Sequence, residues 1–142
     1  MITIIRNKNT LLIEQLDQNL KQMIEAINIK EKLELIDELW SPKVIAELNG
    51  QQVKLAKIQG DFVWHDHKEE DELFYVLKGK LVMEFRDKKV EVNEGELIVV
   101  PKGEEHRPFT KEEVWILLFE PKTTKHTGEV KSDFTVDTPE KI

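Results

Sequence analysis

A series of short apolar segments separated by turn residues runs from Val44 to Glu120 and restricts the fold more than any other feature. The strongest turn signal is Asn49-Gly50, because both residues tolerate the positive φ angles of a two-residue hairpin. Many short strands with regular turns are typical of an all-β sandwich or barrel. The predicted strands are 44–48, 51–58, 62–67, 72–77, 80–86, 89–92, 97–100, 105–109 and 114–120.

Two of these segments also predict which side chains are buried. Leu81, Met83 and Phe85 alternate with residues of the opposite face, so one face of that strand should point into the core. Residues 114–119 are apolar on both faces, which indicates a central strand covered on both sides. The chain therefore has enough strand material for a closed antiparallel β-domain.

The first 42 residues have a helical period instead. A helix is predicted over residues 11–27 and should pack on the domain or on a partner; its apolar face comprises Leu12, Leu16, Leu20, Met23, Ile24 and Ile27. A second helix should follow Asn28, which forms a possible capping box with Glu31. Its apolar stripe ends before Pro42 and comprises Leu33, Ile36, Leu39 and Trp40. Met23 could also be an alternative start, which would make residues 1–22 an appendage.

Composition excludes several classes of protein. The 142 residues contain no cysteine, so disulfides and thiolate metal sites are excluded. The net charge is −7 and no basic stripe is present, which argues against nucleic acid as a partner. No apolar run reaches the roughly 20 residues that span a bilayer, and the N-terminus lacks the pattern of a signal peptide. We expect a cytoplasmic protein with a helical N-terminal extension (1–42), a β-domain (43–121) and a polar C-terminal tail (122–142) that wraps over the domain or frays.

Four possible metal ligands lie in the predicted β-domain. His65 and His67 are two residues apart on a predicted strand, so both imidazoles should face one side. Glu72 opens the next strand, and His106 follows a tight turn into another. A His-x-His pair alone is equally consistent with surface histidines, but its conjunction with a carboxylate and a third histidine favours a metal site. Imidazole and carboxylate ligands suit one divalent ion of Fe, Mn, Ni, Zn, Co or Cu.

These residues resemble the two motifs of the cupin superfamily, in the form found in small single-domain bacterial cupins. The first motif matches Gly60, His65, His67, Glu72 and Gly79, and the second matches Gly95, Pro101, Gly103 and His106. The resemblance covers about residues 44–120. It implies a small antiparallel β-barrel of two facing sheets (a jelly roll), often a homodimer, with the three histidines and Glu72 as metal ligands. Gly60 precedes His65 by one residue fewer than usual, and Thr110 stands where asparagine is usual; neither departure affects a ligand.

Three functions are compatible with such a metal site. The first is a mononuclear metalloenzyme of the oxygenase type that acts on a small organic molecule. The second is a redox-neutral enzyme, either a lyase or a sugar isomerase or epimerase, and the third is a non-catalytic metal- or small-molecule-binding protein. No catalytic residue is assigned. Candidate pocket residues are Phe74, Val76, Leu81, Met83, Phe85 and Phe109, with Tyr75 and Arg107 as possible polar contacts. His126 lies in a polar segment and is predicted to be a solvated loop histidine.

Overall fold

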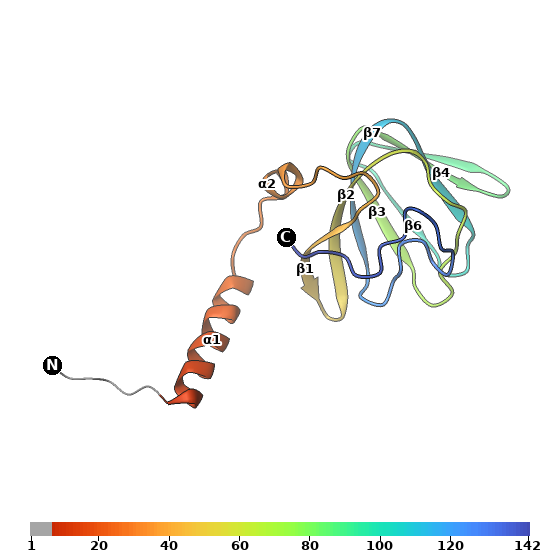
Figure 1. Cartoon of the computed structure of the whole chain (residues 1–142). Coiled ribbons are helices and arrows are strands. Elements are labelled where there is room, and N and C mark those ends of the chain that lie inside the picture. Colours follow the sequence, from red (N-terminus) through yellow and green to blue (C-terminus); the bar gives the residue numbers. More distant parts are fainter. Residues whose placement is uncertain (1–6) are drawn as a thin grey trace.

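The computed structural model describes residues 7–142, except for the side chains of residues 18–23. Figure 1 shows a β-sheet structure with two helices on its N-terminal side. The helices are α1 (Lys8–Met23) and α2 (Ile29–Glu34). The strands are β1 (Lys43–Leu48), β2 (Gln51–Asp61), β3 (Glu72–Lys78), β4 (Lys80–Phe85), β5 (Lys89–Asn93), β6 (Leu97–Val100) and β7 (His106–Pro121).

The long strand β7 organises the antiparallel sheet. It pairs with β2 along almost its whole length. On its other side, residues 106–109 pair with β4 and residues 115–119 pair with β3. The predicted strands 105–109 and 114–120 are therefore one continuous strand. The polar residues between them resemble a turn in the sequence, but they belong to the part of β7 that passes from β4 to β3.

The prediction of a closed barrel is wrong. Among the named strands of the described chain, β1 pairs only with β2, β5 only with β4, and β6 only with β3, so the sheet does not close on itself. The predicted strand 62–67 does not form, apart from a single bridge between His65 and His106. The architecture is mostly β and antiparallel, as the turn pattern predicts.

The hairpin and burial predictions are confirmed. Asn49 and Gly50 have φ angles of 48° and 75°, and they join β1 to β2. Leu81, Met83 and Phe85 are buried in the main core cluster. A second, smaller cluster lies where Leu33 and Ile36 pack with Leu55 of β2. Strand phase therefore predicted the inner face of the sheet correctly.

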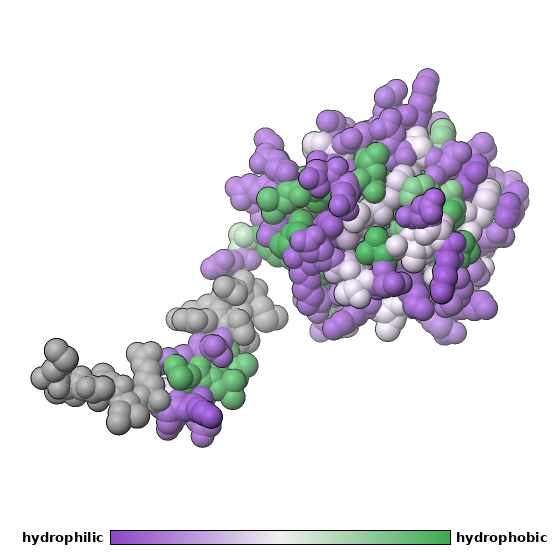
Figure 2. All heavy atoms as spheres, in the orientation of Figure 1, coloured by the Kyte–Doolittle hydropathy of each residue, from purple (hydrophilic) through white to green (hydrophobic). Residues whose placement is uncertain are grey.

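The first helix lies closer to the N-terminus than predicted, and the second is shorter than predicted. Asn7 caps α1, because its Oδ1 accepts a hydrogen bond from the backbone N of Thr10 at 2.8 Å. The helix ends at Met23, so Ile24 and Ile27 lie beyond it and are exposed. Two other residues of its predicted apolar face, Leu20 and Met23, have side chains outside the described residues. Figure 2 shows hydrophobic side chains exposed on α1, which projects away from the sheet.

The second helix starts as predicted and stops early. The Asn28 side chain accepts a hydrogen bond from the backbone N of Glu31, which confirms the predicted cap. The Glu31 carboxylate accepts from Asn28 Nδ2 and not from the Asn28 backbone N, so the reciprocal bond of a full capping box is replaced by a side-chain contact. The helix ends at Glu34 and not before Pro42. The chain then turns so that Trp40, at φ 59°, inserts its ring into the main core, where Nε1 donates to the Gln59 carbonyl at 2.9 Å. Burial of the indole with its N–H satisfied accounts for the departure from helical geometry.

The C-terminal tail wraps over the sheet. Backbone hydrogen bonds join Val44 to Glu140 and Ile142, so the end of the chain pairs with the outer edge of β1. Phe134 packs on the main core, and Thr124, His126 and Thr127 are buried. The predicted solvation of His126 is wrong, because the tail folds this ring inward. No helix among the described residues is long and apolar enough to cross a membrane.

Candidate metal centre

His65 and His67 lie on the irregular segment between β2 and β3. Backbone hydrogen bonds hold this segment: His65 and His106 exchange two, at 2.9 and 3.1 Å, and the Gly103 N–H donates to the His67 carbonyl at 2.7 Å. Both imidazoles are buried. The expectation that they face the same side is confirmed, although the regular strand assumed for it is absent. The glycine turn before β7 therefore anchors the segment that carries two of the candidate ligands.

Glu72 and His106 come from regular strands. Glu72 is the first residue of β3 and His106 the first of β7, and both are buried. Glu72 Oε2 lies 2.9 Å from His67 Nε2 and 3.1 Å from His106 Nε2. One candidate ligand atom from each of His65, His67, Glu72 and His106 lies within 4.8 Å of the other three. The structure thus brings together all four residues that the sequence singled out.

The hydrogen bonds of the histidines leave Nε2 free for a cation. His65 Nδ1 lies 2.9 Å from the Val63 carbonyl, and His106 Nδ1 lies 2.8 Å from the Glu104 carbonyl. A carbonyl only accepts, so each Nδ1 carries the proton, and Nε2 of the neutral ring has a lone pair. At His106 this lone pair faces a carboxylate oxygen. Either a second proton on the ring or a metal ion in its place satisfies these two atoms. Orientation of a ligand histidine through its other nitrogen is usual in metal sites.

The spacing also fits a metal ion. Atoms on opposite sides of an ion with bonds of about 2.1 Å are about 4.2 Å apart. The observed limit of 4.8 Å requires side-chain shifts of only a few tenths of an ångström. His67 Nε2 is one of three buried side-chain N or O atoms that have no hydrogen-bond partner among the described residues. The buried His/Glu cluster could therefore hold a metal ion.

The electrostatics of the cluster favour the ligand forms of these groups. Burial lowers the pKa of His65 to about 4, so its ring is neutral at pH 7. Burial opposes ionisation of Glu72, but the close contacts of its carboxylate with His106 and His67 outweigh it and hold the pKa of Glu72 well below its ordinary value. A neutral imidazole and an ionised carboxylate are the forms that bind a metal.

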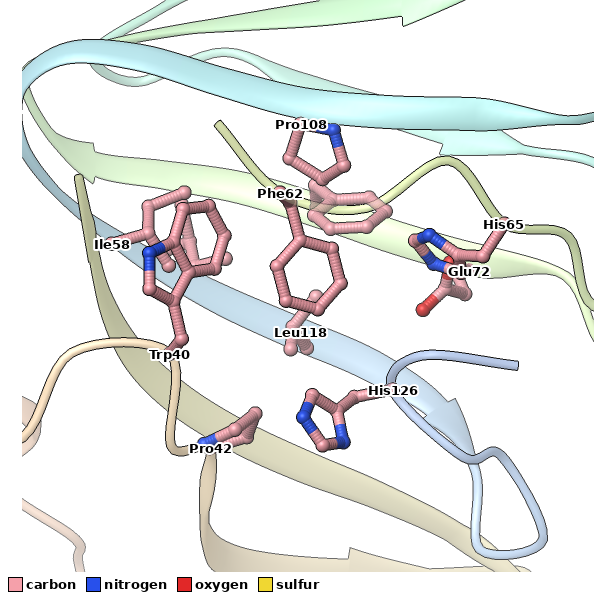
Figure 3. Close-up of a pocket in the computed structure, with 11 residues that line it drawn as sticks. Trp40, Pro42, Ile58, Phe62, His65, Glu72, Pro108, Leu118 and His126 are labelled. Carbon is pink, nitrogen blue, oxygen red and sulfur yellow. The ribbon is translucent and has the colours of Figure 1, made fainter. Parts of the chain in front are cut away.

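A pocket with mainly apolar walls adjoins the cluster. It has an empty volume of about 390 Å³ including its open mouth. Figure 3 shows His65 and Glu72 at one end and Trp40 and Ile58 at the other, with Phe62 between them. The remaining lining residues are Pro42, Phe74, Pro108, Ile116, Leu118 and His126. The walls therefore come from the segment before β1 and from the tail after β7, as well as from the sheet.

Most of the predicted pocket residues have other roles. Only Phe74 lines the pocket. The others are ordinary residues of the hydrophobic core: Val76, Leu81, Met83 and Phe85. Phe109 is not among the lining residues. Arg107 is bound by Glu84, its Nε 2.8 Å from Oε2, and Tyr75 pairs with Leu97 of β6 on the opposite face from Glu72. Neither polar candidate reaches the pocket.

The sequence interpretation missed a buried ion pair close to the cluster. Lys54 Nζ of β2 lies 2.7 Å from Glu120 Oε1 of β7, and both side chains are at most 1% exposed. Strand phase could have found it. Lys54 shares the inward phase of Ala56 and Ile58, and Glu120 shares that of Ile116 and Leu118. Trp40 and His126 carried no such signal, since both lie outside regular strands.

Comparisons with known proteins agree with this architecture. Residues 51–119 match the family model described as "Cupin domain". The crystal structure of a cupin-2 domain containing protein from Shewanella frigidimarina is 45% identical, with a TM-score of 0.68, and the match covers 72% of this chain and 98% of that one. The crystal structure of a Neisseria meningitidis protein is 36% identical, with a TM-score of 0.64 and coverage of 68% and 99%.

A curated relative matches over a shorter stretch. The protein YdbB of Bacillus subtilis is 42% identical over 64 residues, which are 44% of this chain and 57% of YdbB. The chain thus spans little more than half the length of that relative. The structural relatives are matched almost completely and at high identity. Together with the buried His/Glu cluster, they show that the chain belongs to the cupin family.

Proposed function

We propose that His65, His67, Glu72 and His106 hold one divalent transition-metal ion and that the protein is an oxygenase-type enzyme acting on a small organic molecule. The observation that carries the metal proposal is the contact between His106 Nε2 and Glu72 Oε2, 3.1 Å apart while the histidine proton is held on Nδ1. A bound metal ion would take the place of the proton that otherwise bridges these two atoms. When bound, it would supply Lewis acidity or redox chemistry at the end of the pocket.

The pocket walls favour this reading over a sugar-converting enzyme. Trp40, Phe62 and Phe74 offer no hydrogen-bonding groups to a sugar, since even the indole N–H of Trp40 is taken by a backbone carbonyl. No lysine or arginine lines the pocket. Such walls exclude water and suit a ligand with an apolar body. They support the oxygenase and the non-catalytic binding protein equally, and a lyase or a sugar isomerase or epimerase less.

Elemental analysis of protein purified without a metal-affinity tag tests the metal proposal. We expect about one transition-metal ion per chain in the wild type and a large loss in His65→Ala and His106→Ala. The Arg107→Ala protein is a control, because Arg107 binds Glu84 outside the pocket. Iron would favour oxygenase chemistry. A wild-type protein without stoichiometric metal would overturn the proposal.

Three further expectations stay predictions. They are a homodimer, a cytoplasmic location, and a division of the chain at residues 42 and 121. Light scattering on the purified protein tests the first, and cell fractionation tests the second. Limited proteolysis tests the third, since cleavage should begin at the boundaries between independently ordered parts.

A further inference from the structure

The buried pair of Lys54 and Glu120 is not explained by stability. Lys54 is among the largest side chains with less than 2% exposure in the described part of the chain. Burying two charges costs desolvation energy, and replacement of such pairs by apolar residues is often neutral or stabilising. A lysine and a glutamate inside a small apolar core therefore point to another role.

The register of the sheet places this pair beside the candidate metal ligand. Leu73 of β3 pairs with Phe119 of β7, so the next antiparallel position sets Glu72 opposite Glu120. Both carboxyl groups are buried. Glu120 also lies opposite Gln52 of β2, two residues before Lys54. Three neighbouring strands thus bring Lys54, Glu120 and Glu72 together on the inner face.

The contacts form a chain that ends at Glu72. Lys54 occupies Glu120 Oε1, and the carboxyl groups of Glu120 and Glu72 are close enough to interact electrostatically. Glu120 Oε2 has no hydrogen-bond partner among the described residues and is the oxygen free to face Glu72. Glu72 in turn reaches His67 and His106 through Oε2. The position of its carboxylate is therefore fixed from both sides.

We propose that Glu120, anchored by Lys54, is a positioning residue that holds the Glu72 carboxylate in the orientation that binds the metal ion. The inference rests on the proposed metal site and adds a role for two residues that are not ligands. Hydrogen-bonded partners of ligand carboxylates typically change metal affinity about 10- to 100-fold when removed. The same range is expected here.

The test measures the dissociation constant of Co²⁺ by competition with a chelator, together with the visible absorption spectrum of the bound ion. Glu120→Leu removes both contacts and should weaken Co²⁺ binding about 10- to 100-fold and change the spectrum. Glu120→Gln is the conservative variant, because its amide can donate to Glu72 and its carbonyl can accept from Lys54. It should stay within about threefold of the wild type, a small part of that range.

Matched variants separate the possible outcomes. Glu84→Leu removes another ion-paired carboxylate, the one that binds Arg107 outside the pocket, and it should leave Co²⁺ binding unchanged. If Glu120→Leu does not fold because Lys54 is left unpaired, Lys54→Met/Glu120→Leu removes that charge and should show the same weakened binding. Equal losses in Glu120→Leu and Glu120→Gln would overturn positioning in favour of a charge effect, and no loss in either would also overturn it. Failure of the wild type to bind Co²⁺ would instead contradict the metal site itself.

Discussion

The two ends of the chain differ in the structure in the opposite way from what their sequences suggest. Both lie outside the predicted strands, and the N-terminal end carries the stronger apolar pattern. Yet α1 leaves Leu12, Ile13 and Leu16 more than half exposed, whereas the polar tail buries His126 beside the pocket. An apolar pattern predicts that a segment will form a helix, but the contacts available to its side chains decide whether it stabilises the domain.

The tail is held by specific contacts with the rest of the fold. Phe134 stacks on Phe62 with ring centroids 5.3 Å apart, and Phe62 stacks on Trp40 at 4.6 Å. His126 Nε2 donates a hydrogen bond to the Phe134 carbonyl. Gly128 lies against the backbone of Asp66, between the two candidate ligands of the irregular segment. The tail therefore supports both the pocket wall and the segment that carries His65 and His67.

Removing each end in turn should give the largest difference. A chain that stops at Pro121 should lose more than about 3 kcal/mol of unfolding free energy, since loss of one buried phenylalanine alone costs about that much. A chain that begins at Asn28 should change by less than about 0.5 kcal/mol, as is usual for surface positions, since none of the described side chains that it removes is buried. Urea denaturation of both proteins measures this. Equal losses would mean that α1 is covered in solution, for example by a second copy.

The sequence predicted those parts of the molecule whose signals are local. The Asn49-Gly50 turn, the helix cap at Asn28 and the spacing of the four candidate ligands are all read from neighbouring residues, and the structure agrees with each. The prediction of a closed barrel was wrong because pairing between strands that are distant in the sequence gives no signal in neighbouring residues. Residues 110–113 resemble a turn because they are polar, and only the pairing partners of β7 show that the strand continues.

The buried polar groups show a different limit. Strand phase was sufficient to place Lys54 and Glu120 inside, but the charge of these residues argued for solvent, and charge is the better guide in most strands. The burial of His126 could not be predicted from strand phase, because the tail forms no regular strand or helix. Its burial depends on Phe134, Phe62 and Trp40 meeting in space, which one sequence does not reveal.

A single methyl group should have a smaller effect than truncation. In Gly128→Ala the new Cβ would lie 2.2 Å from the Asp66 carbonyl oxygen, at a backbone φ of +58°. Relief of this clash must move the tail or the segment between His65 and His67. We expect a loss of about 2–3 kcal/mol in unfolding free energy from strain and displaced packing, and weaker Co²⁺ binding.

Gly95→Ala is the matched control for this variant. Gly95 also has a positive φ of +83°, but nothing lies within 4 Å of the position of its Cβ. It should therefore lose only the conformational part, about 1 kcal/mol, and bind Co²⁺ as the wild type does. If Gly128→Ala resembled Gly95→Ala in both measurements, the contact between the tail and Asp66 would have no effect on metal binding.

The smallest effect should come from acidification of the tail histidine. Burial lowers the pKa of His126, as it lowers that of His65 to about 4, so both rings are more easily protonated in the unfolded chain. Their contribution to stability is therefore complete above the ordinary histidine pKa of about 6.5 and is lost as the pH falls toward the folded-state values. In metal-free protein, the unfolding free energy should decrease between pH 7 and pH 5, and less so in His126→Gln. The chain that begins at Asn28 should keep the full pH dependence, because residues 1–27 contain no histidine. An unchanged pH dependence in His126→Gln would show that the tail releases this ring to solvent.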